Sequence, residues 1–253
     1  MGATLRIEGG RADGARLPTA EELPYSDGDV MESQWHRDVM YILIDIVNQH
    51  FRDRSDQYCG GDMFIYFSTE LAKNRDFRGP DFYYVKGVPK RTRLSWVAWE
   101  EGWRFPNVIV EAISESTRDK DLGEKKRIYE KVFRTPEYFV VEPDRETLYG
   151  WRLTNGMYRK IKPENGRLWC EQLELYLGFW EGEYLTYLDT YPRFFQPDGQ
   201  LVFTFGEAER ANADAERANA ATTLQKLAES KATNEALLVE LEALKAKLAL
   251  QSP

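Results

Sequence analysis

The sequence is poor in the two side chains that most often bind transition metals. Its 253 residues include only two cysteines, Cys59 and Cys170, and they lie far apart in the chain. Two cysteines exclude a disulfide scaffold and a zinc site built mainly from thiolates. The only histidines are His36 and His50. A metal site that needs several histidines is therefore excluded as well.

The chain also lacks long apolar runs and an excess of positive charge. No run of eighteen apolar residues occurs, so we expect no membrane span. The first sixteen residues have no apolar signal-peptide core, and we expect a cytoplasmic location. The formal net charge of −8 excludes a basic coat for nucleic acid over the whole surface. It leaves room for a local basic patch.

Hydrophobic and aromatic residues are plentiful by contrast. They make up 42% and 13% of the chain, which is enough for a sizeable core and excludes global disorder. Changes in composition predict three parts: a polar, glycine-rich lead segment at 1–25, a domain at 26–205, and a tail at 206–253 without aromatic residues.

The middle part predicts an α/β fold with a mixed sheet. The spacing of apolar residues predicts helices over 38–51 and 122–132, and strands over 63–67, 82–85, 107–113 and 138–141. A strand, a helix and a second strand in this order are typical of a crossover connection. The pair Asn155-Gly156 predicts a hairpin. In the aromatic-rich stretch 173–191 we interpret Gly178 and Gly182 as turn positions.

The tail predicts one long helix. Alanine, glutamate, lysine and leucine dominate it, and between its first and last residues it has no glycine or proline. One heptad frame has Leu224, Lys231, Leu238 and Lys245 at position a, and Leu227, Asn234, Leu241 and Leu248 at position d. Three of these eight residues are polar, so two interpretations stay open. The tail is either a solvated helix or a coiled-coil seam for oligomerisation.

Two acids occupy positions where a core does not favour a charge. Asp81 opens a strand directly after Pro80, and Glu111 lies inside an apolar run. A buried carboxylate costs several kcal/mol unless it is paired or bound to a metal. If the two strands pair, both carboxylates converge at one end of the sheet, where hard oxygen ligands suit Mg²⁺ or Mn²⁺. The alternative is that Asp81 caps a turn and Glu111 faces solvent.

The next helix adds a cation near these acids. Asp121, Lys125 and Tyr129 share one helix face at i, i+4 and i+8. This helix follows the Glu111 strand, so Lys125 can reach the carboxylates; the alternative is an ordinary surface laced with ion pairs. His36, which begins a helix, is a candidate proton carrier near neutral pH or a structural histidine. Glu32 is a weaker candidate of the same kind.

Taken together, these residues resemble the Uma-two family of restriction-endonuclease-like proteins, within the PD-(D/E)XK nuclease superfamily. The resemblance covers about 17–205. Its motifs are Gly28-Asp29 with His36, Pro80-Asp81, Val110-Glu111-Ala112-Ile113-Ser114-Glu115-Ser116-Thr117, Asp121 to Lys125 with Tyr129, and Pro136-Glu137-Tyr138-Phe139-Val140-Val141-Glu142-Pro143. It implies a restriction-endonuclease-like core flanked by helices, and metal-dependent hydrolysis of phosphodiester bonds.

The resemblance also implies roles for single residues. Asp81 and Glu111 would bind Mg²⁺ or Mn²⁺, with the carbonyl of Ala112 as a third ligand. The superfamily lysine that follows the acid by two residues is replaced by Ile113 here. The resemblance therefore implies that Lys125 takes its place, and the catalytic candidates are Asp81, Glu111, Lys125 and His36.

Two functions follow from this pattern. The first is a Mg²⁺-dependent endonuclease acting on DNA. Its phosphate contacts would come from two basic clusters, Lys86, Lys90, Arg91 and Arg93, and Arg118, Lys120, Lys125, Lys126 and Arg127, unless these are simply solvated surface. The second is a catalytically silent nuclease-like scaffold that binds a partner or self-associates through the C-terminal helix. The acidic charge balance slightly favours the second.

Overall fold

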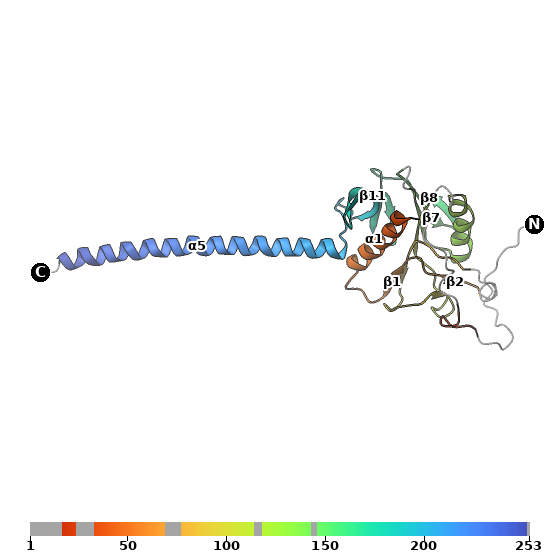
Figure 1. Cartoon of the computed structure of the whole chain (residues 1–253), viewed down its shortest axis with the longest axis horizontal. Helices are drawn as coiled ribbons and strands as arrows, with labels where there is room; N and C mark the ends of the chain where they lie inside the picture. The colour runs from red at the N-terminus through yellow and green to blue at the C-terminus, as the bar shows by residue number, and fades with distance from the viewer. Residues whose placement is uncertain (1–16, 24–32, 69–76, 114–117, 143–145, 252–253) are drawn as a thin grey trace, which may run out of the picture. The chain divides into compact units, whose positions relative to one another are not determined.

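The structure is a computed structural model that describes residues 17–23, 33–68, 77–113, 118–142 and 146–251 (Figure 1). Contacts divide the chain into two compact units, residues 1–204 and 205–253. Most of the lead segment lies outside the described residues, and the boundary at 25/26 stays a prediction. No helix in the described ranges is long and apolar enough to cross a bilayer.

The first unit is built on a six-stranded mixed sheet. Its strand order is β1-β3-β5-β6-β7-β8. The strands are β1 Gln57–Gly60, β3 Phe82–Lys86, β5 Val108–Ala112, β6 Glu137–Glu142, β7 Thr147–Thr154 and β8 Met157–Lys160. Only the pair β5–β6 is parallel. Every residue of these two central strands is buried, which is why their sequences are nearly continuous apolar runs. The predicted mixed α/β class is confirmed.

One face of this sheet is covered by helix α1, Gln34–His50 (Figure 1). Alternate strand residues such as Phe82, Tyr84 and Val110 form a core cluster with the apolar stripe of α1. A three-stranded sheet joins the same cluster. Its strands are β9 Leu168–Cys170, β10 Leu175–Tyr184 and β11 Tyr187–Phe195. The indole of Trp35 donates to the carbonyl of Thr190 at 2.9 Å. This bond fixes the start of α1 against β11.

The opposite face holds the helical segment that follows β5. It runs through α3 Arg118–Lys120, η1 Asp121–Lys125, α4 Lys126–Ile128 and η2 Tyr129–Phe133, and η1 and η2 are π-helical turns. The helix predicted over 122–132 is present, but these wide turns were not expected. Arg134 ends the segment in the left-handed conformation, with φ of 53°. The short parallel strands β2 Ile65–Tyr66 and β4 Trp96–Val97 lie on the same side.

Strand alternation decides which face each acid can reach. In β5, Val108, Val110 and Ala112 belong to the α1 face, and Ile109 belongs to the opposite cluster. Glu111 therefore points toward the helical segment 118–133, because successive strand side chains alternate between faces.

Two turn predictions have different outcomes. The hairpin between β7 and β8 turns at Asn155 and Gly156, whose φ values are 51° and 75°, as predicted. Gly178 and Gly182 are not turn residues, because both lie inside β10. A Cβ at Gly182 would lie 2.0 Å from the Trp180 ring, so this glycine makes room for a side chain.

The second unit is the single helix α5, Phe205–Gln251. The predicted long helix is confirmed, and its leucines are largely exposed. The coiled coil stays a prediction, since a single chain does not test it. The side chain of Leu248 lies outside the described residues.

Candidate functional site

The two predicted acids meet at the start of β3. In the antiparallel pair β3–β5, Phe82 is opposite Val110, which places Asp81 beside Glu111. The backbone N–H of Asp81 lies 3.5 Å from Glu111 Oε2, and the N–H of Ala112 donates to Asp81 Oδ2 at 2.7 Å. Both carboxylates are therefore held at one end of the sheet. Glu111 is fully buried, so the alternative that it faces solvent at an edge is wrong.

Glu111 has two side-chain partners from the helical segment. The Tyr129 hydroxyl donates to Oε1 at 2.7 Å, and Lys125 Nζ lies 3.2 Å from Oε2. Burial raises the pKa of Glu111 to about 8, although the Lys125 charge pulls this pKa down. The negative charges of Asp81 and Asp121 add to the increase. Near neutral pH this carboxyl group is poised between its neutral and charged forms.

Lys125 is held between two buried acids. Its Nζ lies 2.7 Å from Asp121 Oδ1 as well as 3.2 Å from Glu111, and its side chain is 17% exposed. Burial works to lower the pKa of Lys125, but the charges of Glu111, Asp121 and Asp81 outweigh it and raise the pKa. The ammonium group is therefore a fixed positive charge at the carboxylates.

His36 reaches the same cluster from α1. Its Nε2 lies 2.7 Å from Asp81 Oδ1, and the two side chains are 15% and 20% exposed. The hydroxyl of Ser33 caps the helix by accepting the backbone N–H of His36. The imidazole itself is therefore not the cap. It links the start of α1 to Asp81, which is the more exposed of the two acids.

Sequence reasoning placed Tyr129 and Asp121 on the face of Lys125 but did not predict their contacts. Those contacts with Glu111 and Lys125 depend on how the segment is rotated against the sheet. The Tyr138 hydroxyl fixes this rotation by donating to the backbone carbonyl of Asp121 at 3.0 Å. The two π-helical turns contain all three residues of the face, and such turns are frequent at functional sites.

The donor set fits a hard divalent cation. Within the described ranges, no group of three or more His, Cys, Asp or Glu side chains is placed to hold a metal ion. Magnesium does not need such a cage, because one or two carboxylates with water and substrate phosphate are its usual ligands. Asp81 and Glu111 supply two carboxylates at one strand end beside Ala112.

Comparison with protein families identifies the chain. The family model Uma2, described as "Putative restriction endonuclease", matches residues 13–188, well over half of the sequence. The chain belongs to the Uma2 family. Membership supports a nuclease at the level of the family. The motif residues Gly28-Asp29, 114–117 and Pro143, like Glu32, lie outside the described residues.

Other comparisons are less informative. No curated protein matches the chain. Among solved structures it is similar to a crystal structure of "a putative nuclease belonging to DUF820" from Anabaena variabilis, at 12% identity and a TM-score of 0.43. The match covers 62% of this chain and 90% of that chain. The assignment to Uma2 therefore depends on the family model.

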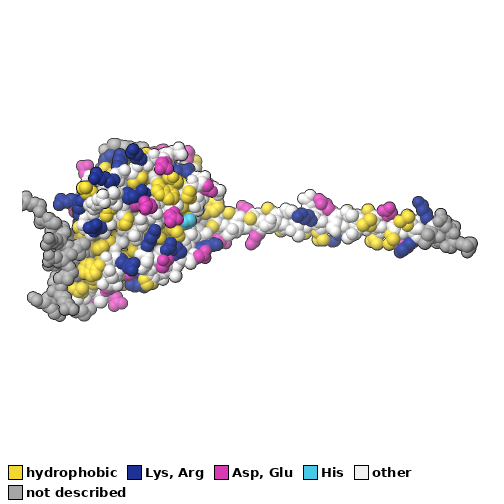
Figure 2. Space-filling view, turned by 180° about the vertical axis from the view of Figure 1, so that it is seen from behind, with side chains coloured by type: hydrophobic (Ala, Val, Ile, Leu, Met, Phe, Trp, Pro, Cys, Tyr) yellow, Lys and Arg dark blue, Asp and Glu magenta, His cyan; other side chains and the backbone are white. Residues whose placement is uncertain are grey.

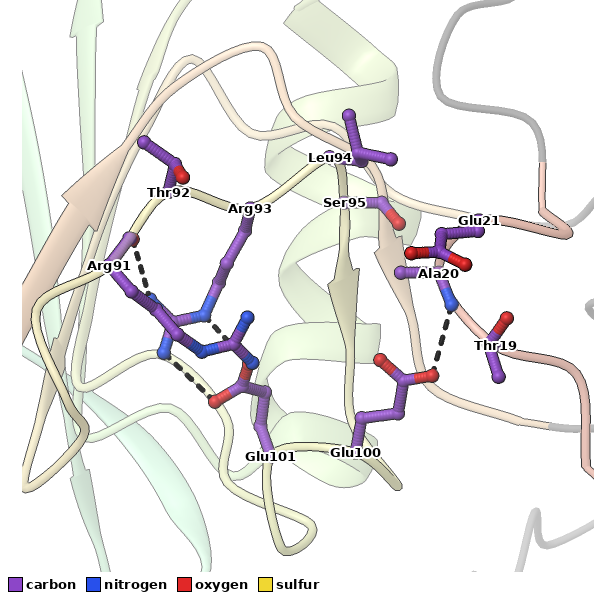
Figure 3. Close-up of a pocket in the computed structure, with 10 residues that line it drawn as sticks. All are labelled: Thr19, Ala20, Glu21, Arg91, Thr92, Arg93, Leu94, Ser95, Glu100 and Glu101. Atoms are coloured by element: carbon purple, nitrogen blue, oxygen red, sulfur yellow. Dashed lines mark hydrogen bonds and ion pairs between the residues drawn. The ribbon is translucent and has the colours of Figure 1, made fainter.

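The first basic cluster of this Uma2 protein is partly neutralised. Arg93 binds Glu101 through Nε at 2.7 Å and through a terminal nitrogen at 3.0 Å, and its side chain is 1% exposed. Its guanidinium lies over Tyr58 and Trp96, at 4.6 and 4.9 Å from the ring centres. Arg91 binds the same Glu101 at 2.6 Å beside a polar pocket (Figure 3). The interpretation of Arg93 as a phosphate contact is wrong, because the side chain is buried and paired.

The second basic cluster divides in the same way. Arg118 binds the Glu142 carboxylate and donates to the Tyr149 hydroxyl at 3.1 Å. Lys126 lies 4.0 Å from the ring centre of Trp151. Three basic residues of the two clusters are exposed and have no paired acid within the described ranges: Lys90, Lys120 and Arg127.

Proposed function

We propose that this Uma2 protein is a divalent-metal-dependent endonuclease that hydrolyses DNA phosphodiester bonds at the cluster formed by Asp81, Glu111 and Lys125. The observation that supports it most is that Lys125 Nζ lies 3.2 Å from Glu111, the acid that the β3–β5 pairing places beside Asp81. Family membership supports the same reaction class.

In this proposal, three oxygen-bearing groups at the end of the sheet bind the metal ion. Asp81, Glu111 and the carbonyl of Ala112 would hold Mg²⁺ or Mn²⁺. The bound ion would supply Lewis acid chemistry at the scissile phosphate and lower the pKa of a bound water. Since Glu111 must lose its proton to bind a cation, metal binding releases a proton below about pH 8.

The ammonium group of Lys125 has a role separate from that of the metal ligands. Lys125 keeps its charge because three carboxylates surround it, so it can offset the negative charge that develops on the phosphate. Asp121 and Tyr129 are positioning residues in this scheme. Asp121 holds the ammonium group at 2.7 Å, and Tyr129 holds the Glu111 carboxylate at 2.7 Å.

His36 is proposed to move protons between the cluster and water. It contacts Asp81, the more exposed of the two acids, at 2.7 Å. Histidine changes charge close to neutral pH, which suits this role. Lys90, Lys120 and Arg127 are proposed phosphate contacts, so DNA binding should weaken as the salt concentration rises.

The decisive experiment is a cleavage assay on plasmid DNA and on single-stranded DNA with Mn²⁺ or Mg²⁺. We expect cleavage by the wild-type chain and none by Asp81→Ala, provided that both proteins melt cooperatively. A folded wild-type protein that cleaves neither substrate with either metal would contradict the proposal.

The second candidate is a catalytically silent scaffold. It is favoured by the pairing of Arg91 and Arg93 with Glu101, which removes positive charge that DNA needs. Thermal melting with Mn²⁺ separates the two, because a ligand that binds only the folded state raises the melting temperature. A scaffold without a metal site should show no increase.

A further inference from the structure

The apolar side chains of α5 have nothing to cover them in the described residues. Seven large apolar residues between positions 224 and 244 are 47–71% exposed: Leu224, Leu227, Leu237, Leu238, Val239, Leu241 and Leu244. Figure 2 shows such side chains lying between charged ones along the helix. A helix that exposes this much leucine is typical of one that buries a stripe against a partner.

The spacing of these residues defines a seam. Leu237, Leu241 and Leu244 are four and three residues apart, and the same repeat continues upstream through Asn234 and Ser230 to Leu227. We call these six residues the α5 seam. Compared with the first heptad frame, the seam keeps the row of Leu227, Asn234 and Leu241. The other row changes from one that contains Lys231 and Lys245 to one that contains Ser230, Leu237 and Leu244, so no charged residue lies in the seam.

We propose that α5 forms a parallel, in-register, two-stranded coiled coil with a second copy of this chain through the α5 seam. This goes beyond the proposed function and does not depend on it. The second copy is the occupant because the seam is self-complementary when two identical helices lie in register.

Asn234, one of the two polar residues in the seam, favours the parallel arrangement. In a parallel pair, Asn234 faces Asn234 of the second copy, and the two amides can hydrogen-bond with each other. Full antiparallel overlap of the seam would place Asn234 against Leu237 and leave a buried amide without a partner. A single asparagine at an a position is the device that specifies a parallel dimer at a cost in stability.

The flanking charges favour the same arrangement. A parallel pair brings Glu240 beside Lys245 of the second copy, twice by symmetry. Full antiparallel overlap of the seam would instead bring Lys226 near Lys247 of the second copy, twice by symmetry, which places like charges together. Within one helix Lys245 lies 3.1 Å from Glu242, but this pair is exposed and weak. The one like-charged contact of the parallel pair is between Lys226 and Lys231, so we expect the seam to be strongest after Asn234.

Sedimentation equilibrium of the full chain tests the association. We expect twice the chain mass of 29.5 kDa in the micromolar range. Leu241→Glu should give the monomer mass, because it places a charge in the seam. Val239→Glu is the matched control, since Val239 is 71% exposed and lies on the opposite side of α5. A monomeric wild type, or a Val239→Glu variant that dissociates as fully as Leu241→Glu, would overturn the proposal.

Cysteine cross-linking tests the orientation. Leu244→Cys should form a disulfide-linked dimer under mild oxidation, because only a parallel, in-register pair places both Cα atoms within reach. Cys59 and Cys170 are buried and should not compete. A dimer that fails to cross-link would show that the helices are antiparallel or out of register. A Leu238→Glu variant that dissociates while Leu237→Glu does not would show that the other heptad frame is used.

Discussion

The two units break the usual arrangement of side chains in opposite ways. The first unit buries charge: the Glu111 and Asp121 side chains are 0% and 3% exposed, and Lys125 lies between them at 17%. The second unit exposes apolar groups of the seam, with Leu237 at 56% and Leu244 at 57%. Neither arrangement improves the stability of an isolated chain. These are therefore the two places where we propose that the chain binds something else.

The two units also differ in where the contacts of these side chains come from. In the first unit the side chains of the cluster make four contacts with one another, so the cluster is assembled within the domain itself. In α5 the exposed leucines share only a repeat along the helix, and a partner must supply the contacts. We expect substitutions in the cluster to change chemistry, and substitutions in α5 to change association.

The largest expected effect is on cleavage by Lys125→Ala. The variant should lose turnover by roughly two to three orders of magnitude, as when one oxyanion donor is removed. Its metal affinity should stay the same or rise, since the ammonium charge opposes a cation. Arg127→Ala is the control, because Arg127 is an exposed cation two residues along the same segment. Equal losses in both variants would mean that the segment binds DNA and that Lys125 has no special catalytic role.

The second prediction concerns the stability of Glu111→Gln. The pKa of Glu111 is about 8 in the folded protein and ordinarily 4.5. The stability that this group contributes is therefore fully present below about pH 4.5 and falls as the pH rises to about 8. Each pKa unit is worth about 1.4 kcal/mol, so the loss amounts to several kcal/mol.

Urea unfolding at several pH values measures this loss. Relative to the wild type, Glu111→Gln should gain stability from pH 5 to pH 8.5 and then level off. Calorimetry should show weak Mn²⁺ binding by the variant at every pH, and wild-type binding that strengthens toward pH 8. A constant stability difference across this range would mean that Glu111 is ionised throughout.

The third prediction is a smaller change in Tyr129→Phe. Loss of the hydroxyl removes a hydrogen bond to the ionised Glu111, which costs about 1–3 kcal/mol when the acceptor stays buried. The pKa of Glu111 should rise further, and Mn²⁺ affinity at pH 7 should fall by about tenfold. Tyr158→Phe is a matched control, because that hydroxyl donates to the backbone carbonyl of Thr135 at 3.0 Å. If both variants lose metal affinity equally, Tyr129 acts only through general stability.

Much of the site could be predicted because it depends on chain order. Strands β3 and β5 pair, so Asp81 and Glu111 meet, and the segment after β5 returns past the strand end with Lys125. What could not be predicted depends on rotation and packing. The contact of Tyr129 with Glu111 depends on how the helical segment is rotated and positioned against the sheet. Arg93 is buried against two aromatic rings, and predicting this would have required the path of the 89–95 loop.

The last prediction expects almost no effect on the first unit, and it tests whether the two units are independent. Deletion of 206–253 should leave a folded domain, because the division between the units falls at 204/205 and the deleted segment has no aromatic residue. Its side chains beyond Ala213 are exposed throughout the described part of α5, so the deletion uncovers no core. Surface changes of this kind are usually within about 0.5 kcal/mol, so the melting temperature should shift by less than about 2 °C. Near-ultraviolet circular dichroism should keep its aromatic signal while the far-ultraviolet helix signal falls. A truncated chain that fails to melt cooperatively would show that the first unit needs α5, and that the exposed leucines serve folding after all.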